Sequence, residues 1–271
     1  MQNKLRFWLF RKIKHLKFRL LSKPTTDILL IMGCQRSGTS MLMRTFDWHG
    51  QTKVYRELSE VFDDMRLIDD KKVFDHFNKT GAPMVVAKPL LDSQKFQHYL
   101  DLDQRIKVLW PYRHYKSVAK SNLRKFGSNN GKRDLSFITE NHPTDWRNEF
   151  VSESDRVLVK RLLDSGISDL DAAALFWYLR NKLITECRDL DLTRIKCIKY
   201  ETITQQPSKA FSSIFRFLNQ DIESLKLEEI HTNPKSSKKA IELNEEIEQL
   251  CQGVYEQIEQ LAAQSFPELE N

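Results

Sequence analysis

The chain has 271 residues, of which 40% are hydrophobic and 30% are charged, a balance typical of a folded globular protein. This length supports one large α/β domain or two small ones, and the composition excludes disordered, collagen-like and low-complexity classes. The longest apolar run, Ile28 to Met32, is far shorter than the roughly 18 to 20 residues of a membrane-spanning helix. The four cysteines form neither a CxxC pair nor a cluster with histidines, so we expect a reduced, cytoplasmic and metal-free protein.

The formal net charge of +6 comes from an N-terminal arm. Residues 1–23 contain eight Lys and Arg and no acidic residue, whereas residues 24–271 contain 35 basic and 37 acidic side chains. The main body is therefore not a polybasic surface, and we expect no nucleic-acid partner.

Within the arm, apolar residues recur at helical spacing, with cations largely between them. These apolar positions are Leu5, Trp8, Leu9, Ile13, Leu16 and Leu20. The pattern predicts a basic amphipathic helix with two interpretations: it lies on an anionic membrane surface as a peripheral arm, or it packs on the rest of the protein. Lys23 and Pro24 mark the expected boundary between the arm and a single domain of residues 24–271.

Beyond the arm, short apolar runs bounded by glycine or proline alternate with helical patterns. Strands are predicted for residues 27–32, 52–55, 84–87, 106–110 and 195–200. Helices are predicted for residues 38–48, 93–100, 115–125, 170–188, 209–218 and 242–263. The repeated strand-then-helix order predicts a three-layer α/β/α architecture with a central parallel sheet. We interpret the polar segment 126–144 as a long loop able to act as a lid.

The turn after the first strand has the strongest functional pattern in the chain. It reads Gly33-Cys34-Gln35-Arg36-Ser37-Gly38-Thr39-Ser40. Two glycines five residues apart let successive backbone N–H groups point inward, and the N-terminus of the following helix adds partial positive charge. Thr39 and Ser40 add hydroxyl donors. The segment therefore predicts a P-loop-like phosphate-binding turn.

One departure limits which phosphate ligand this turn suits. The spacing matches the nucleotide-triphosphatase loop G-x-x-x-x-G-K-(S/T), except that Thr39 stands at the lysine position. That lysine normally bridges the β- and γ-phosphates, so ATP or GTP hydrolysis is disfavoured. Arg36 instead supplies a cation inside the loop, suited to binding a phosphate or stabilising a leaving group.

These residues resemble the sulfotransferases that use 3′-phosphoadenosine 5′-phosphosulfate (PAPS), whose loop has the form (K/R)-S-G-T-(S/T) after a buried strand. Two later segments carry the same resemblance. Arg113, at the end of a strand, precedes Ser121 by eight residues, as in the family's 3′-phosphate segment. Tyr200-Glu201-Thr202, followed by Pro207 and Phe217-Leu218-Asn219, is similar to the family's Y-E-(D/T), P and F-L-(G/N) stretch. The resemblance covers residues 27–220, with the three landmarks in the expected order.

The resemblance implies a P-loop-like sulfotransferase fold and an enzyme that moves a sulfuryl group from PAPS to a hydroxyl or amine. A glycan, a lipid or a small molecule is a candidate acceptor. The resemblance also implies that Arg113 and Ser121 bind the 3′-phosphate and that Tyr200 lies near the adenine. The implied phosphosulfate-binding residues are Gly33, Arg36, Ser37, Gly38, Thr39 and Ser40.

A base is needed to take the acceptor's proton. Many family members use a histidine after a Lys-Thr pair, but the corresponding stretch here is Lys88-Pro89 without a histidine, which leaves Lys88 as a leaving-group cation. Members that act on carbohydrates often use a glutamate after a short strand, and Glu57 has that place, with Glu60 as the alternative. The catalytic residues implied by the resemblance are therefore Arg36, Glu57 and Lys88. The simpler interpretation is that both glutamates are solvated carboxylates at a helix start.

Two other function classes stay open. One is a P-loop kinase that transfers phosphoryl groups, and the other is a membrane-associated nucleotide-binding module without turnover. The single histidines His49, His114 and His142 are expected to be structural or solvated. A basic loop near the C-terminal helix is a further candidate for cofactor contact; its residues are Lys235, Lys238 and Lys239.

Overall fold

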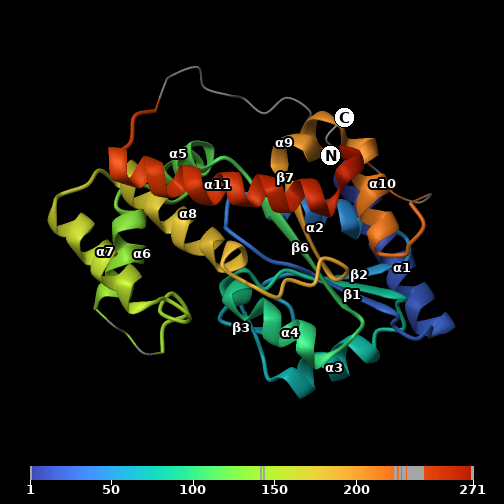
Figure 1. The fold of residues 1–271 in the computed structure, drawn as a ribbon. Coiled ribbons are helices and arrows are strands. Elements are labelled where there is room, and N and C mark those ends of the chain that lie inside the picture. Colours follow the sequence, from blue (N-terminus) through green and yellow to red (C-terminus); the bar gives the residue numbers. More distant parts are fainter. Residues whose placement is uncertain are drawn as a thin grey trace.

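The computed structural model describes residues 2–140, 142, 144–222, 225, 227, 230 and 241–269. Its centre is a five-stranded parallel sheet (Figure 1). The strands, in their order across the sheet, are β2 (Thr52–Tyr55), β5 (Met84–Ala87), β1 (Asp27–Ile31), β6 (Ile106–Tyr112) and β7 (Ile195–Lys199). All neighbouring pairs are parallel, so the predicted α/β class is confirmed, and each predicted strand is present.

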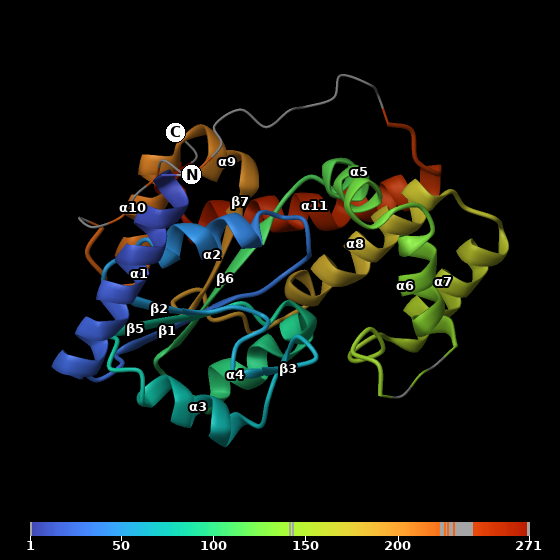
Figure 2. The same cartoon turned by 180° about the vertical axis from the view of Figure 1, so that it is seen from behind.

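Helices cover both faces of this sheet. The helices that the structure describes are α1 (Gln2–Leu21), α2 (Thr39–Asp47), α3 (Asp70–Asn78), α4 (Phe96–Leu102), α5 (Tyr115–Phe126), α6 (Asn130–Thr139), α7 (Glu153–Asp164), α8 (Asp169–Thr185), α9 (Tyr200–Gln205), α10 (Pro207–Phe217) and α11 (Glu245–Ser265). Of these, α6 and α7 pack beside α8 at one end of the molecule and do not cover the sheet (Figure 1). Shorter elements are the hairpin of β3 (Phe62–Asp63) and β4 (Arg66–Leu67) and the 3-10 helices η1 (Leu90–Lys95) and η2 (Pro267–Leu269). In Figure 2, α2 lies on one side of the sheet and α3 and α4 lie on the other.

Side chains of β1 alternate between two hydrophobic cores. Ile28 and Leu30 belong to the core that includes residues of α3, α4, α8 and α11. Leu29 and Ile31 belong to the core formed with α2, α9 and α10. All four side chains are at most 1% exposed, so the strand is buried on both faces, as its continuous apolar run predicts.

The end of β6 differs from the prediction. The strand was expected to end before Pro111, because proline cannot donate a ladder hydrogen bond, but it continues to Tyr112. Leu109 accepts a hydrogen bond from Met32 N, so its backbone polar groups face β1. Pro111, two residues later, faces the same side, which is where the N–H that proline lacks would point. The pairing with β1 ends at Leu109, so the proline costs no ladder bond there.

The interpretation of residues 126–144 as a long loop is wrong for the part of this segment that the structure describes, because it contains α6. The helix depends on a close approach to α8. A Cβ placed on Gly131 would lie 2.6 Å from the backbone nitrogen of Ala173 and 2.8 Å from the carbonyl carbon of Ala172. A glycine that resembles a loop signal in the sequence is therefore a packing residue between two helices.

This packing makes a stability prediction. Gly131→Ala is expected to lower the free energy of unfolding by roughly 1 to 3 kcal/mol, because the added methyl group meets backbone that cannot rotate away. The matched control is Gly253→Ala in α11, where no described atom lies within 4 Å of the new Cβ. That change should leave stability unchanged or raise it by up to about 1 kcal/mol, the helix-propensity gain. Urea denaturation of both variants measures the difference, and equal stabilities would contradict the proposed packing role.

Candidate functional site

The predicted site residues follow the carboxyl ends of all five strands. Gly33 follows β1, Glu57 follows β2, Lys88 follows β5, Arg113 follows β6 and Tyr200 follows β7. In a parallel sheet these ends share one edge, and β1 lies between β5 and β6, where the direction of the strand order reverses. Ligands of open α/β sheets bind at this kind of position.

The turn between β1 and α2 has an unusual backbone. Gly33, Arg36 and Gly38 have φ of 122°, 69° and 93°, in the left-handed region that favours glycine. A Cβ on Gly38 would lie 2.5 Å from Cδ2 of Tyr200, and a Cβ on Gly33 would lie 3.2 Å from Nε1 of Trp110. Both glycines are therefore required by conformation and by packing, and the turn leads into the N-terminus of α2, as an anion-binding turn does.

Arg36 connects this turn to α5. Its Nε donates a hydrogen bond to Oγ of Ser121 at 3.1 Å. Burial, followed by the positive charges of Arg124 and Arg113, lowers the pKa of Arg36 below its usual value. Three guanidinium groups thus lie near one another, an arrangement that a bound polyanion would stabilise.

Arg113 lies against Tyr200, the first residue of α9. Its guanidinium carbon is 4.4 Å from the centre of the tyrosine ring, a cation–π distance. Arg113 Nε is 3.4 Å from Oε1 of Glu201, but this nitrogen is buried without a hydrogen bond to any described residue. Because the same ring also lies against Gly38, the three segments that carry the resemblance meet in one place.

Lys88 and Glu57 complete the same edge of the sheet. Lys88 Nζ donates to Oγ of Ser40, in the first turn of α2, at 3.3 Å, and lies 3.0 Å from Oε1 of Glu57. The Lys88 side chain is 8% exposed and that of Glu57 is 34% exposed, so the carboxylate is the part of the pair that solvent reaches. Glu60 is exposed and lies near Tyr55, whose pKa is raised first by burial and then by this glutamate.

A cleft of about 590 Å³ opens beside these residues. Its lining includes the predicted residues Gly33, Arg36, Thr39, Ser40, Glu57 and Lys88. Arg113, Ser121, Tyr200 and Glu60 are not among the described residues that line it. The cleft therefore begins at the turn and extends away from Arg113 and Tyr200.

Comparison with solved structures identifies the fold. The chain matches the sulfotransferase domain of the Synechococcus PCC 7002 olefin synthase with a TM-score of 0.51 and 14% identity, covering 86% of this chain and 96% of that domain. It matches the sulfotransferase domain from the curacin biosynthetic pathway with a TM-score of 0.52 and 14% identity, over 86% and 99% of the two chains. A sulfotransferase from Alicyclobacillus acidocaldarius matches with a TM-score of 0.50 and 15% identity, over 90% and 96%. The chain has the sulfotransferase fold.

At these identities the likeness concerns the fold alone. No family model matches the sequence, and the search of curated proteins finds no significant relative. The sulfotransferase fold concerns the path of the backbone, whereas the spacing of the three segments concerns particular residues.

The far wall of the cleft contains residues that the sequence did not indicate as functional. Two guanidinium groups contact the ring of Trp146, with the Arg147 and Arg180 guanidinium carbons 4.5 and 5.0 Å from its centre. Arg180 donates to Gln94 Oε1 and to Leu90 O, both at 3.0 Å, and burial lowers its pKa to about 10. Arg180 directly follows the apolar run of residues 172–179 in α8, and a charged residue that continues such a run is the signal that could have identified it.

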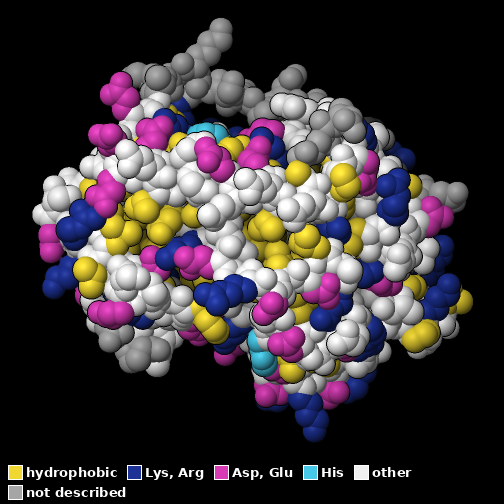
Figure 3. Space-filling model, viewed as in Figure 1, with side chains coloured by type: hydrophobic (Ala, Val, Ile, Leu, Met, Phe, Trp, Pro, Cys, Tyr) yellow, Lys and Arg dark blue, Asp and Glu magenta, His cyan; other side chains and the backbone are white. Residues whose placement is uncertain are grey.

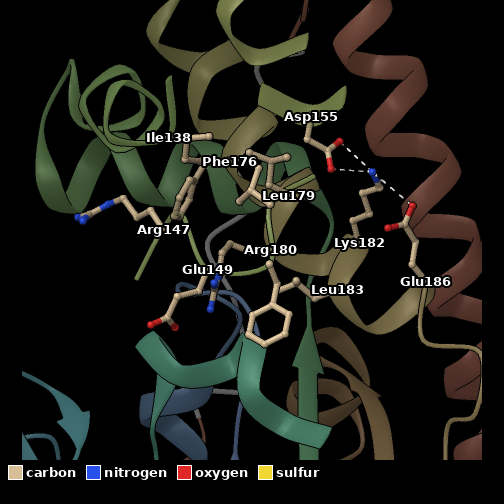
Figure 4. Close-up of a pocket in the computed structure, with 12 residues that line it drawn as sticks. Ile138, Arg147, Glu149, Asp155, Phe176, Leu179, Arg180, Lys182, Leu183 and Glu186 are labelled. Carbon is tan, nitrogen blue, oxygen red and sulfur yellow. Dashed lines mark hydrogen bonds and ion pairs between the residues drawn. The ribbon is translucent and has the colours of Figure 1, made fainter. Parts of the chain in front are cut away.

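A second cavity lies behind this wall (Figure 4). Its volume of about 30 Å³ is enough for one or two water molecules, so it does not hold a substrate. Lys182 Nζ lies 2.8 Å from Asp155 Oδ1 and 3.3 Å from Glu186 Oε1, as the dashed lines in the figure mark. The Lys182–Asp155 pair joins α8 to α7 and thereby supports the wall that Arg147 and Arg180 form.

The histidines are placed away from the cleft lining as far as the structure describes it. His49 is buried, with Nδ1 2.8 Å from Thr52 Oγ1 and Nε2 2.8 Å from Asp221 O. His114 caps α5 by accepting from Lys116 N, and His142 pairs with Glu140. Among the described residues no three His, Cys, Asp or Glu side chains are grouped to hold a metal ion. The predicted basic loop of Lys235, Lys238 and Lys239 lies outside the described residues.

Proposed function

We propose that this protein is a PAPS-dependent sulfotransferase that transfers a sulfuryl group to a hydroxyl or amine. The observation that carries the proposal is the meeting of the turn after β1, the Arg113–Ser121 segment and Tyr200 at one edge of the sheet. These are the three segments on which the resemblance rests, and the sulfotransferase fold of the chain agrees with it.

The residues present fit this donor. The cluster of Arg36, Arg113 and Arg124 favours a ligand with several negative charges. The buried Nε of Arg113 donates to no described residue, so it is available to donate to such a ligand. Arg113 and Ser121 would hold the 3′-phosphate, and the Tyr200 ring would lie near the adenine. The phosphosulfate would be held by Gly33, Arg36, Ser37, Gly38, Thr39 and Ser40. When bound, PAPS supplies an activated sulfuryl group attached to a phosphate leaving group.

Three side chains would carry the transfer. Glu57 accepts the proton as the acceptor oxygen or nitrogen forms its bond to sulfur and the bond between sulfur and the phosphate oxygen breaks. Lys88, held between Ser40 and Glu57, stabilises the charge that the departing phosphate gains. Arg36 does the same from the turn, where Ser121 orients its guanidinium group.

The acceptor would occupy the part of the cleft that extends from Glu57 toward α6 and α8. That part is lined by apolar and charged side chains together, among them Met65, Phe126 and Trp146 beside Arg133 and Arg147. A mixed wall of this kind suits an acceptor that presents a polar group on a larger apolar or ring-shaped body. A glycan, a lipid and a ring-containing small molecule all have this character.

The experiment that tests the proposal compares three nucleotides by thermal shift. Adenosine 3′,5′-bisphosphate should raise Tm more than ATP or AMP at equal concentration, because a ligand that binds the folded state stabilises it according to its affinity. A preference for ATP would support the kinase class. Bisphosphate binding without any sulfuryl transfer from PAPS to a panel of hydroxyl and amine acceptors would support the non-catalytic module. No preference for the bisphosphate would contradict the proposal.

The residue basis of this preference is tested by Arg113→Ala. It should weaken binding of adenosine 3′,5′-bisphosphate by about 1.5 to 3 kcal/mol, the range for a hydrogen bond to a charged group, and leave AMP binding unchanged. The control is Arg161→Ala on α7, which removes an exposed arginine paired with Glu246 and should change neither affinity. Isothermal titration calorimetry measures both, and equal losses for the two nucleotides would contradict a 3′-phosphate contact.

A further inference from the structure

Helix α1 packs on the domain through one face. Phe7 and Phe10 lie with their ring centres 4.6 and 5.4 Å from that of Trp48, and Phe18 is 7% exposed. Lys14 is buried and donates to the backbone oxygen of Asp47 at 2.6 Å, and burial lowers its pKa to about 8. The helix is therefore fixed to the protein by aromatic contacts and a buried lysine.

The opposite face of α1 is apolar and open to solvent. We call these residues the α1 stripe; they are Leu5 (69% exposed), Trp8 (56%), Leu9 (52%), Ile13 (50%), Leu16 (55%) and Leu20 (74%). At 3.6 residues per turn, the stripe points away from the face that contains Phe7, Lys14 and Phe18. A helix on a protein surface ordinarily presents polar side chains to water, so six large apolar side chains in one line are unusual.

Cations lie on both sides of the α1 stripe. By the same helical geometry Lys12 and Arg19 fall along one edge and Arg6 and Lys17 along the other, and all four are exposed. Residues 1–23 contain no acidic side chain that could neutralise them. Figure 3 shows hydrophobic and Lys or Arg side chains next to one another at the edge where α1 lies in Figure 1.

We propose that the α1 stripe and its flanking cations dock on an anionic lipid bilayer, with the helix in the plane of the interface. Charge complementarity selects this occupant: the apolar side chains enter the boundary of the acyl chains while the cations on both edges meet anionic headgroups. A second copy of the chain would bring the same cations against one another. None of the helices in the described part of the chain has the length and apolar character that crossing a membrane requires. The α1 surface is thus an interfacial contact.

The face of α1 that packs on the protein would give the membrane contact a fixed orientation. Because α1 is held through Phe7, Lys14 and Phe18, the bilayer would orient the whole domain. Both ribbon views show α1 at one end of the molecule and α6 and α7 at the other (Figures 1 and 2). The end of the cleft lined by α6 residues would therefore be directed away from the end that touches lipid.

The test uses the full chain and sedimentation with vesicles of phosphatidylcholine, with or without phosphatidylserine. The stripe variant is Leu9→Glu/Ile13→Glu/Leu16→Glu. The matched control is Leu58→Glu/Leu102→Glu/Val157→Glu. It adds the same negative charge and removes a similar amount of apolar side chain at exposed positions outside α1. All six side chains are exposed, the least of them Leu102 at 42%, so both variants should keep the wild-type Tm. Removing residues 1–23 is a poorer test, because it also removes Phe18 and Lys14 from their buried contacts.

Wild type and the control should pellet with the phosphatidylserine vesicles, and the stripe variant should bind at least about 10-fold more weakly. Binding of the wild type should weaken as salt is raised and be weaker on phosphatidylcholine alone. Equal binding of the stripe and control variants, or no pelleting of the wild type, would overturn the proposal. A wild-type dimer that the stripe variant converts to a monomer, without vesicle binding, would show that the occupant is a second copy.

Discussion

Replacing Arg36 with alanine is expected to lower kcat for sulfuryl transfer by about 100- to 1,000-fold, the cost of losing one group that stabilises charge in the transition state. Binding of adenosine 3′,5′-bisphosphate should weaken much less, by roughly 10-fold, because one charge-assisted hydrogen bond is lost. The expected separation between kcat and affinity follows from a guanidinium group that acts most strongly while the leaving phosphate gains charge. Steady-state kinetics with PAPS and calorimetry with the bisphosphate measure the two quantities.

The matched control is Arg36→Lys. Position 36 has φ of 69°, which strains any residue with a side chain, and lysine retains both this strain and the positive charge. It loses the planar group whose Nε bonds to Ser121, so an intermediate kcat is expected. If bisphosphate binding of the alanine variant falls as far as kcat does, Arg36 binds the ground state and has no special role in the transition state.

The strands were predictable because their signals are local. A parallel strand buried on both faces must be apolar along its length, so the runs at β1 and β5 stand out between their glycine and proline neighbours. The end of β6 was not predictable, since the tolerance of Pro111 depends on where β1 stops pairing. Helix α6 was missed for a similar reason: the role of Gly131 depends on Ala172 and Ala173, about forty residues away.

The candidate site divides in the same way. The turn after β1 and the Arg113–Ser121 spacing each lie within one strand and the helix that follows it, so their patterns are visible in the sequence. Trp146 and Arg180 join the site only through tertiary packing, and no spacing between them indicates it. The α1 stripe was predictable from the helical spacing of its apolar residues. The face of α1 that packs on the protein, which includes Phe7 and Lys14, was not predictable, because its aromatic and basic residues do not form an apolar run.

The second large effect is expected for Glu57→Gln. It should lower kcat by about 100- to 10,000-fold, the usual contribution of a general base, and leave bisphosphate binding unchanged. The geometry behind this expectation is the contact of the Glu57 carboxylate with Lys88, which in turn reaches the turn that would hold the phosphosulfate. A carboxylate in this place can accept a proton close to the group that receives the sulfuryl. Gln has nearly the same shape and cannot accept that proton.

Glu60→Gln is the matched control, because it makes the same chemical change three residues away on a side chain that is exposed and does not line the described cleft. It should keep at least half of the wild-type kcat. Glu57→Asp separates proton transfer from the ion pair, since it retains a carboxylate on a shorter stem and should recover part of the rate that Gln loses. If Glu60→Gln is the inactive variant and Glu57→Gln is active, the base is Glu60. If both glutamine variants are active, neither glutamate takes the proton, and the Lys88–Glu57 pair only stabilises the edge of the sheet.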